Sequence, residues 1–81
     1  MILKYPISTE KVVKLIETEN KLVFVVDRRA SKYQIAREFE KEFKVKPLKI
    51  NTEIRGSKKM AFIKLKPENP ALDIATKLGI M

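Results

Sequence analysis

The segment PLKINTEIRGSKKMAFIKLK, residues 47–66, has the alternating pattern of two consecutive β-strands. Apolar or small side chains recur at every second position, first at Leu48, Ile50, Thr52 and Ile54, and then at Ala61, Ile63 and Leu65. This period of two is typical of strands with one buried face and one face in water. Gly56 and Ser57 lie between the two runs. Because Gly adopts a positive φ without steric cost, this pair predicts a two-residue hairpin turn.

The expected turn is strongly basic. Arg55, Lys58 and Lys59 flank it, and Glu53 is the only acid close by. Like charges on neighbouring strand positions repel one another, so this arrangement is poorly suited to stability alone. We interpret the tip as a surface for an anionic partner.

The positive charge of the chain is concentrated around this hairpin. The net charge is +8, from 18 basic and 10 acidic residues. Residues 41–66 hold nine Lys or Arg and two acids, a net charge of +7, whereas residues 1–40 carry +2 (eight minus six) and residues 67–81 carry −1 (one minus two). A local field of this sign attracts phosphate backbones or anionic membrane surfaces. The alternative is a solvated Lys- and Glu-rich surface, which heat-adapted proteins also favour.

Composition disfavours several other classes of function. The chain has no Cys and no His, which removes disulfides, thiolate chemistry and the commonest zinc ligand. With only two glycines there is no glycine-rich phosphate loop, and no carboxylate pair stands out as an acid–base couple. The longest apolar run, residues 22–26, is far shorter than a membrane span, and no signal peptide is visible. We therefore expect a cytoplasmic, non-enzymatic protein with one domain, residues 1–81, and with neither metal nor cofactor.

The first half of the chain predicts two strands and a helix. Residues 2–5 form a short edge strand that Pro6 ends. A helix over residues 9–19 follows, with Ser8 as its N-cap and Asn20 as a left-handed stop. Residues 21–27 are apolar on both faces of a strand, so this strand is expected at the centre of the sheet, covered on both sides.

Two further helices are expected. Ser31 and Gln34 form a capping box that begins a helix from residue 32 to about residue 44. Its apolar stripe repeats every four residues, at Ile35, Phe39 and Phe43. The last helix is predicted to begin with Asn69 as N-cap and Pro70 at the first helical position, and to end at Gly79.

The resulting order, β-α-β-α-β-β-α, predicts an α+β fold. A four-stranded antiparallel sheet with helices on both faces, a three-layer α/β/α arrangement, covers both sides of the central strand. A two-layer ferredoxin-like arrangement is the nearest alternative. The hairpin alone establishes only that the third and fourth strands are neighbours.

Polar and basic residues at three places are candidates for contact with a phosphate-bearing partner. The first helix begins with free N–H groups that favour a phosphate. Cations also precede the second helix, and polar or basic side chains line the hairpin. The candidates are Ser8, Thr9, Lys11, Arg28, Arg29, Lys32, Lys49, Asn51, Thr52, Arg55, Lys58 and Lys59.

Several segments, taken together, resemble one family along nearly the whole chain. They are Pro6-Ile7-Ser8-Thr9-Glu10-Lys11, Asn20 through Val26, Ala30-Ser31-Lys32, and the hairpin from Val45 to Ala61. Their order and spacing resemble the universal large-subunit ribosomal protein L23 family. The final stretch, residues 71–80, is similar to the archaeal and eukaryotic ending of that family.

This resemblance implies a structural constituent of the large ribosomal subunit that binds large-subunit ribosomal RNA beside the polypeptide exit tunnel. It also implies the neighbouring ribosomal protein L29, and docking of the signal recognition particle, nascent-chain chaperones and the translocation channel. Bacterial members extend the hairpin into the tunnel, whereas here only Gly56 and Ser57 separate the strands. The chain therefore resembles archaeal-type members with a short hairpin.

Two alternatives differ in class from an RNA-binding protein. The first is a protein-docking module with only incidental RNA binding, suggested by the mixed charges of Glu38, Glu40, Lys41 and Glu42. The second is a small ferredoxin-like enzyme acting on phosphorylated or acylated substrates, which only the fold class suggests.

Overall fold

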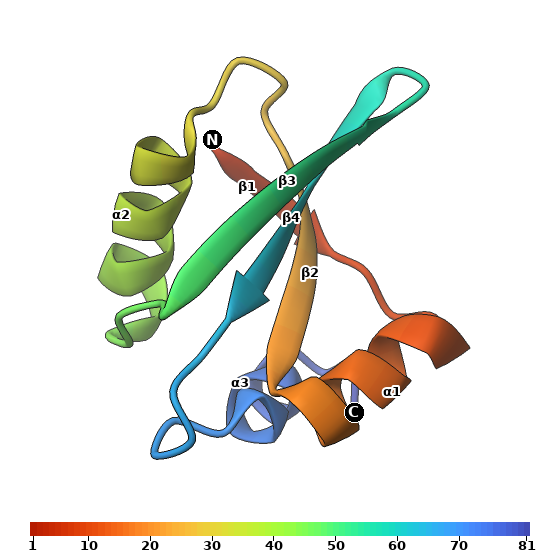
Figure 1. Cartoon of the computed structure of the whole chain (residues 1–81), viewed down its shortest axis with the longest axis vertical. Helices are drawn as coiled ribbons and strands as arrows, with labels where there is room; N and C mark the ends of the chain where they lie inside the picture. The colour runs from red at the N-terminus through yellow and green to blue at the C-terminus, as the bar shows by residue number, and fades with distance from the viewer.

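The computed structural model describes all 81 residues and contains four strands and three helices (Figure 1). In chain order these elements are β1 (Leu3–Pro6), α1 (Glu10–Glu19), β2 (Lys21–Val26), α2 (Lys32–Phe43), β3 (Lys49–Arg55), β4 (Lys58–Lys64) and α3 (Ala71–Lys77). The strands form one antiparallel sheet in the order β1-β2-β4-β3. The expected α+β fold and element order are therefore confirmed.

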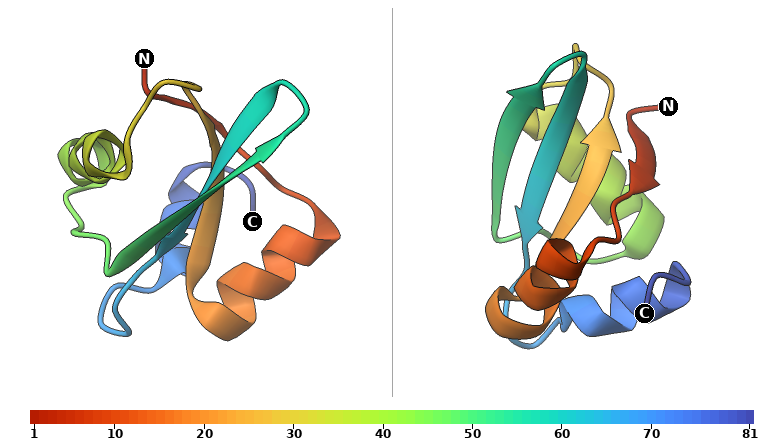
Figure 2. Two further views of the ribbon diagram at one scale, coloured as in Figure 1. Left: turned by 45° about the horizontal axis from the view of Figure 1, so that its top comes forward. Right: turned by 90° about the vertical axis from the view of Figure 1, so that its right-hand side faces the viewer.

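The central strand is β2, as its sequence predicted. It pairs with β1 on one side and β4 on the other, and its residues from Leu22 to Val26 are all buried. Helix α2 lies against one face of the sheet. Helices α1 and α3 lie at the end of the sheet away from the hairpin tip, and α1 is on the face opposite α2 (Figure 2). The second helical layer therefore covers only part of its face.

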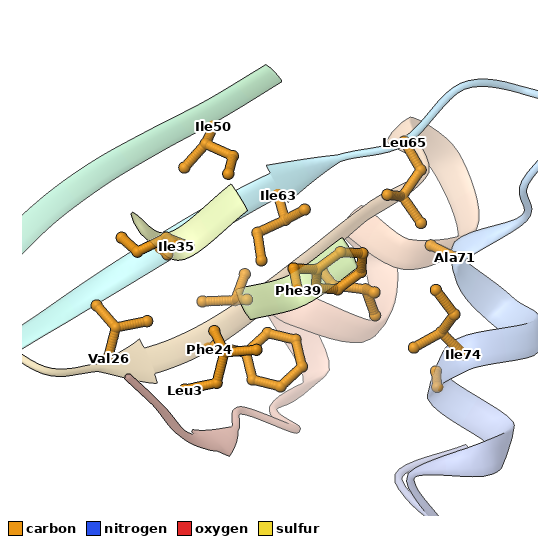
Figure 3. Packing of buried hydrophobic residues seen from close by; sticks show 14 of the residues in the cluster. Leu3, Phe24, Val26, Ile35, Phe39, Ile50, Ile63, Leu65, Ala71 and Ile74 are labelled. Atoms are coloured by element: carbon orange, nitrogen blue, oxygen red, sulfur yellow. The ribbon is translucent and has the colours of Figure 1, made fainter. Parts of the chain in front are cut away.

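Helix α2 supplies the largest side chains of the core. Phe39 is fully buried and its ring meets Phe24 of β2 edge to face, with the centroids 6.1 Å apart (Figure 3). Phe43 lies 4.8 Å from Phe39 between ring centroids, so the predicted stripe continues to the end of the helix. Of the 18 buried residues, 17 belong to one hydrophobic cluster to which all seven elements contribute; only Val25 of β2 lies outside it.

Two helix starts differ from the sequence-based expectation. Thr9 caps α1, because its Oγ1 accepts a hydrogen bond from the N–H of Val12 at 3.2 Å, whereas the hydroxyl of Ser8 donates to the carbonyl of Ile80. The prediction of Ser8 as the cap is wrong by one residue. Asn69 does not cap α3 with its side chain; Pro70 occupies the N-cap position and has no side-chain cap.

The missing cap of α3 comes from a distant residue. The Oδ1 atom of Asn20 accepts from the N–H of Ala71 at 2.6 Å. Its Nδ2 atom donates to the carbonyls of Leu65, Lys66 and Asn69 at 3.0–3.2 Å. Asn20 also adopts the predicted left-handed conformation, with φ of 56°. One side chain thus joins the end of α1 to the connection between β4 and α3.

The hairpin forms as predicted, but its apolar face is buried only in part. Gly56 has φ of +59°, and Arg55 pairs with Lys58 across the two-residue turn. Ile50 is buried, whereas Leu48 and Ile54 are 52% and 54% exposed. Leu48 precedes the strand, and Ile54 lies beside the turn, where the tip extends past the core. The expectation of a continuous buried face on β3 is therefore wrong at these two residues.

Candidate nucleic-acid interface

The loop between β2 and α2 and the tip of the hairpin lie at the same end of the sheet. The last residue of β2, Val26, pairs with Lys59, one position beyond the Arg55–Lys58 pair that closes the turn. Both segments lie toward the top of Figure 1, with the loop to the left of the hairpin tip. The cations of this region, here called the basic end, are Arg28, Arg29, Lys32, Arg55 and Lys58, and all five are exposed.

Lys59 holds the two segments of the basic end together. Its Nζ atom donates a hydrogen bond of 2.6 Å to the backbone carbonyl of Ala30, in the loop before α2. Ala30 is buried, so this carbonyl has little access to water. A charged donor makes such a bond stronger than a neutral one. Lys59 therefore positions the loop, and its charge is less available to a partner than sequence reasoning assumed.

The loop has a second internal support. The carboxylate of Asp27 accepts a hydrogen bond of 2.9 Å from the backbone N–H of Arg29. This bond is the main reason why the pKa of Asp27 lies below its ordinary value, and the charges of Lys4 and Arg29 add to the lowering. Because Asp27 turns to the backbone, the exposed side chains of Arg28 and Arg29 make no ion pair. They are free to meet an external anion.

The three cations of the hairpin tip do not act alike. Arg55 makes a 2.8 Å ion pair with Glu53 two residues earlier on the same strand. Lys58 lies over the ring of Tyr5, with its Nζ atom 5.8 Å from the centroid. Lys59 points to the opposite face and bonds Ala30. The predicted mutual repulsion at the tip is therefore relieved within the protein.

A row of three lysines crosses the other end of the sheet. Lys21 of β2 pairs in register with Lys64 of β4, and Lys64 pairs with Lys49 of β3. Residues paired directly across strands share one face, so these ammonium groups are neighbours. Sequence reasoning found Lys49 but missed Lys21 and Lys64. The alternating pattern of β4 already placed Lys64 on the face away from Ile63. Only the strand order shows that Lys21 and Lys49 lie beside it.

The remaining candidates are spread over other surfaces. Asn51 is exposed on the same face as Lys49, whereas Thr52 points to the face that α2 covers and is half-buried. Ser8, Thr9 and Lys11 lie at the start of α1, which Figure 1 places away from the hairpin tip. Thr9 uses its hydroxyl as the helix cap. The twelve candidates therefore do not form one site.

Few of the charged side chains on the surface pair with one another. Only two ion pairs occur, Lys21 with Glu19 and Arg55 with Glu53, so most of the 18 basic side chains have no acidic partner. No group of three or more acidic side chains is placed to hold a metal ion. None of the three helices has the length and apolar character needed to cross a membrane.

Comparison with known proteins identifies the family. The family described as Ribosomal protein L23 matches residues 1–71 of the chain. The chain belongs to the ribosomal protein L23 family. A curated relative, "Large ribosomal subunit protein uL23" of Puccinia graminis, is 49% identical over 77 residues, which cover 94% of this chain and 49% of the relative. The chain thus spans about half the length of the curated relative that it matches.

Membership confirms the resemblance inferred from the segments around Asn20, Ser31 and the hairpin. The L23 family consists of ribosomal proteins rather than enzymes, so the interpretation as a non-enzymatic protein is also confirmed. The ferredoxin-like enzyme is excluded on the same ground.

Proposed function

We propose that this L23-family protein is a structural component of the large ribosomal subunit that binds large-subunit ribosomal RNA beside the polypeptide exit tunnel. The observation that carries the proposal is the basic end, where five exposed cations from two segments are gathered. Arg and Lys at such positions contact phosphate oxygens and release counterions from the RNA. The name of the Puccinia graminis relative, a large-subunit protein, supports the choice of RNA.

The basic end is held in shape before it meets RNA. Lys59 fixes the loop to the hairpin and Asp27 closes the loop on itself. Because little ordering remains to be done on binding, less of the binding free energy is lost to conformational entropy. A preformed surface of this kind suits a protein that binds folded RNA as a rigid body.

Binding of the purified chain to transcripts of large-subunit and small-subunit RNA tests the proposal. We expect preferential binding of the large-subunit transcript, and footprints on it that are confined to a few helices. Equal affinity for both transcripts, with no localised footprint, would leave only non-specific attraction between a basic protein and RNA.

We further propose that the outer face of α2 is the protein-docking surface of this member in the cytoplasmic ribosome. Tyr33 is 68% exposed there, beside an open hollow of about 900 Å³. The hollow is lined by Ile2, Ser31, Tyr33, Gln34, Arg37, Glu38, Glu40 and Lys41, a mixture of both charges. No other element lies over the outer side of α2, so this side remains accessible when the basic end meets RNA.

The partners proposed for this surface are ribosomal protein L29, the signal recognition particle, nascent-chain chaperones and the translocation channel. Reversing the charge with Glu40→Lys is expected to weaken capture of signal recognition particle by purified ribosomes, with RNA affinity unchanged. The matched control is Lys77→Glu on α3, away from the hollow. If both variants capture the particle as well as the original chain, α2 is not the docking surface.

A further inference from the structure

The face of β3 and β4 opposite α2 has an unusual composition for a surface that no helix covers. Ile50, Ala61 and Ile63 point into the core beneath α2, so their alternating neighbours point the other way. These neighbours include Asn51 on β3 and Phe62 on β4, which pair in register. The right-hand view of Figure 2 shows this face toward the viewer, and no helix crosses β3 or β4 there.

Two aromatic side chains belong to this open face. Tyr5 of the edge strand pairs with Val25, which pairs in turn with Met60. The ring of Tyr5 lies under the ammonium of Lys58. Tyr5 is 45% exposed, and Phe62 is only half-buried. Phe62 lies two strands away and two residues further along the face. Ordinary strand spacing therefore places the Cα atoms of Tyr5 and Phe62 about 12 Å apart.

Positive charges border the aromatic pair at both ends. Arg55 and Lys58 lie toward the turn, and the row of Lys21, Lys64 and Lys49 lies toward the other end. The two borders are separated by six residues of strand, or about 20 Å. Glu53 is the only acid among these strand residues and pairs with Arg55, and Glu19 before β2 pairs with Lys21, so Lys58, Lys64 and Lys49 are the border cations without an acidic partner.

We propose that this face, built around Tyr5 and Phe62, binds an unpaired segment of RNA, with bases stacked on the two rings and phosphates held at the basic borders. Charge complementarity selects a polyanion. The exposed ring of Tyr5 and the half-buried ring of Phe62 select unpaired bases, because bases within a duplex are stacked on one another and offer no free π-face. Asn51, exposed beside Phe62, provides an amide that donates to and accepts from a base edge. The inference rests on the proposed RNA-binding function and specifies the kind of RNA that this face takes.

Tyrosine fluorescence measures stacking on this face without ambiguity. The chain has no Trp and only two Tyr, Tyr5 on the open face and Tyr33 on α2. In the variant Tyr33→Leu, all tyrosine emission comes from Tyr5. A short unstructured oligoribonucleotide is expected to quench this emission, whereas an abasic oligomer of the same length, or a duplex of the same sequence, is expected to leave it unchanged. Quenching by the abasic oligomer or by the duplex to the same extent overturns the proposal.

Affinity gives the second readout, with a matched pair of variants. Tyr5→Leu keeps an apolar side chain but removes the ring, and we expect affinity for the oligoribonucleotide to fall about five- to 150-fold, the range measured when one stacked aromatic is removed. The slope of affinity against salt should not change, because no charge is lost. Tyr33→Leu is the control and should bind as the original chain does.

The outcomes separate this inference from the proposed function. If Tyr5→Leu and Tyr33→Leu bind the oligoribonucleotide equally, the stacking surface is refuted, even where the large-subunit transcript is still bound through the basic end. Binding of an acidic peptide or of anionic vesicles that quenches Tyr5 more strongly than RNA does also refutes it. Loss of affinity in Tyr5→Leu alone, together with quenching by unpaired RNA alone, supports it.

Discussion

Replacement of Lys59 by Gln should destabilise the free protein, although Lys59 lies beside an exposed turn. The substitution removes the ammonium that donates a 2.6 Å hydrogen bond to the buried carbonyl of Ala30. Hydrogen bonds from charged donors contribute about 1.5–3 kcal/mol. In a domain of this size each kcal/mol corresponds to about 4–8 °C in melting temperature, so Lys59→Gln should lower it by about 6–24 °C.

Lys58→Gln is the matched control, one residue earlier on β4. Lys58 is exposed and its contact is with the ring of Tyr5, a cation–π interaction worth about 0.5–1 kcal/mol at such a site. Because Arg55, its cross-strand neighbour, remains paired with Glu53, the net change should not exceed this cation–π contribution and should stay below about 1 kcal/mol. Thermal denaturation followed by circular dichroism compares the two variants directly.

In RNA binding, by contrast with thermal stability, Lys58→Gln should have a larger effect than Lys59→Gln. Lys58→Gln removes a cation that is free to meet a phosphate and should lower the salt slope by about one. Lys59→Gln should leave the slope nearly unchanged, because its ammonium is already bonded to Ala30. Equal melting temperatures for the two variants, or a larger fall in melting temperature for Lys58→Gln than for Lys59→Gln, would refute the positioning role of Lys59.

Three further predictions concern the cap, the loop and the arginines. Asn20→Gly keeps the left-handed conformation but loses all four hydrogen bonds of the amide, of which the three donated ones share two N–H groups. They amount to about three full bonds worth about 0.5–1.5 kcal/mol each, so urea denaturation should show a loss of about 1.5–4.5 kcal/mol in the free energy of unfolding; a loss no larger than that of an exposed loop residue would contradict this role. The pKa of Asp27, measured by carboxyl NMR, should lie below its ordinary value because the N–H of Arg29 donates to the carboxylate. The stability difference between the original chain and Asp27→Asn should therefore be present above the ordinary pKa and disappear as pH falls through the lowered one; a pH-independent difference would exclude this linkage. Changing Arg28 and Arg29 to Ala should weaken RNA binding with the melting temperature within a few degrees, since exposed charges contribute little to stability; a large fall in melting temperature with unchanged binding would make the pair structural.

Features that depend on neighbouring residues were predictable from the sequence. The capping box of Ser31 and Gln34 is present with both of its hydrogen bonds. Gly79 has φ of +76° after the last helix, as its place in the sequence indicated, although Leu78 is the C-cap residue. These motifs need only a few consecutive residues, so their energetics are contained in the local sequence.

Features that depend on distant residues were not predictable. Asn20 takes over the capping of α3 from Asn69, and its acceptor bond spans 51 residues. Lys59 finds its carbonyl partner 29 residues away. No local pattern distinguishes such a lysine from its exposed neighbour Lys58, because both belong to the same basic run.

The candidate site was likewise predictable where it depends on neighbouring residues and not where it depends on distant ones. The charge excess of residues 41–66 correctly indicated a basic hairpin. The pairing of β2 with β4 was not visible in the sequence, and that pairing aligns Lys21 with Lys64 and places the loop of Arg28 and Arg29 beside the tip. Residues on opposite faces of β3, such as Asn51 and Thr52, were grouped together although the strand separates them.

The salt dependence of binding to large-subunit RNA is the decisive measurement for the proposed interface. Arg55 is paired with Glu53, and the other four cations of the basic end, each neutralising one phosphate, predict that log affinity falls against log salt with a slope of about −2.8 or steeper. The double substitution of Arg28 and Arg29 by Ala should make that slope shallower by about 1.4–1.8. A slope near zero, or one that the double substitution leaves unchanged, would contradict the assignment of RNA binding to the basic end.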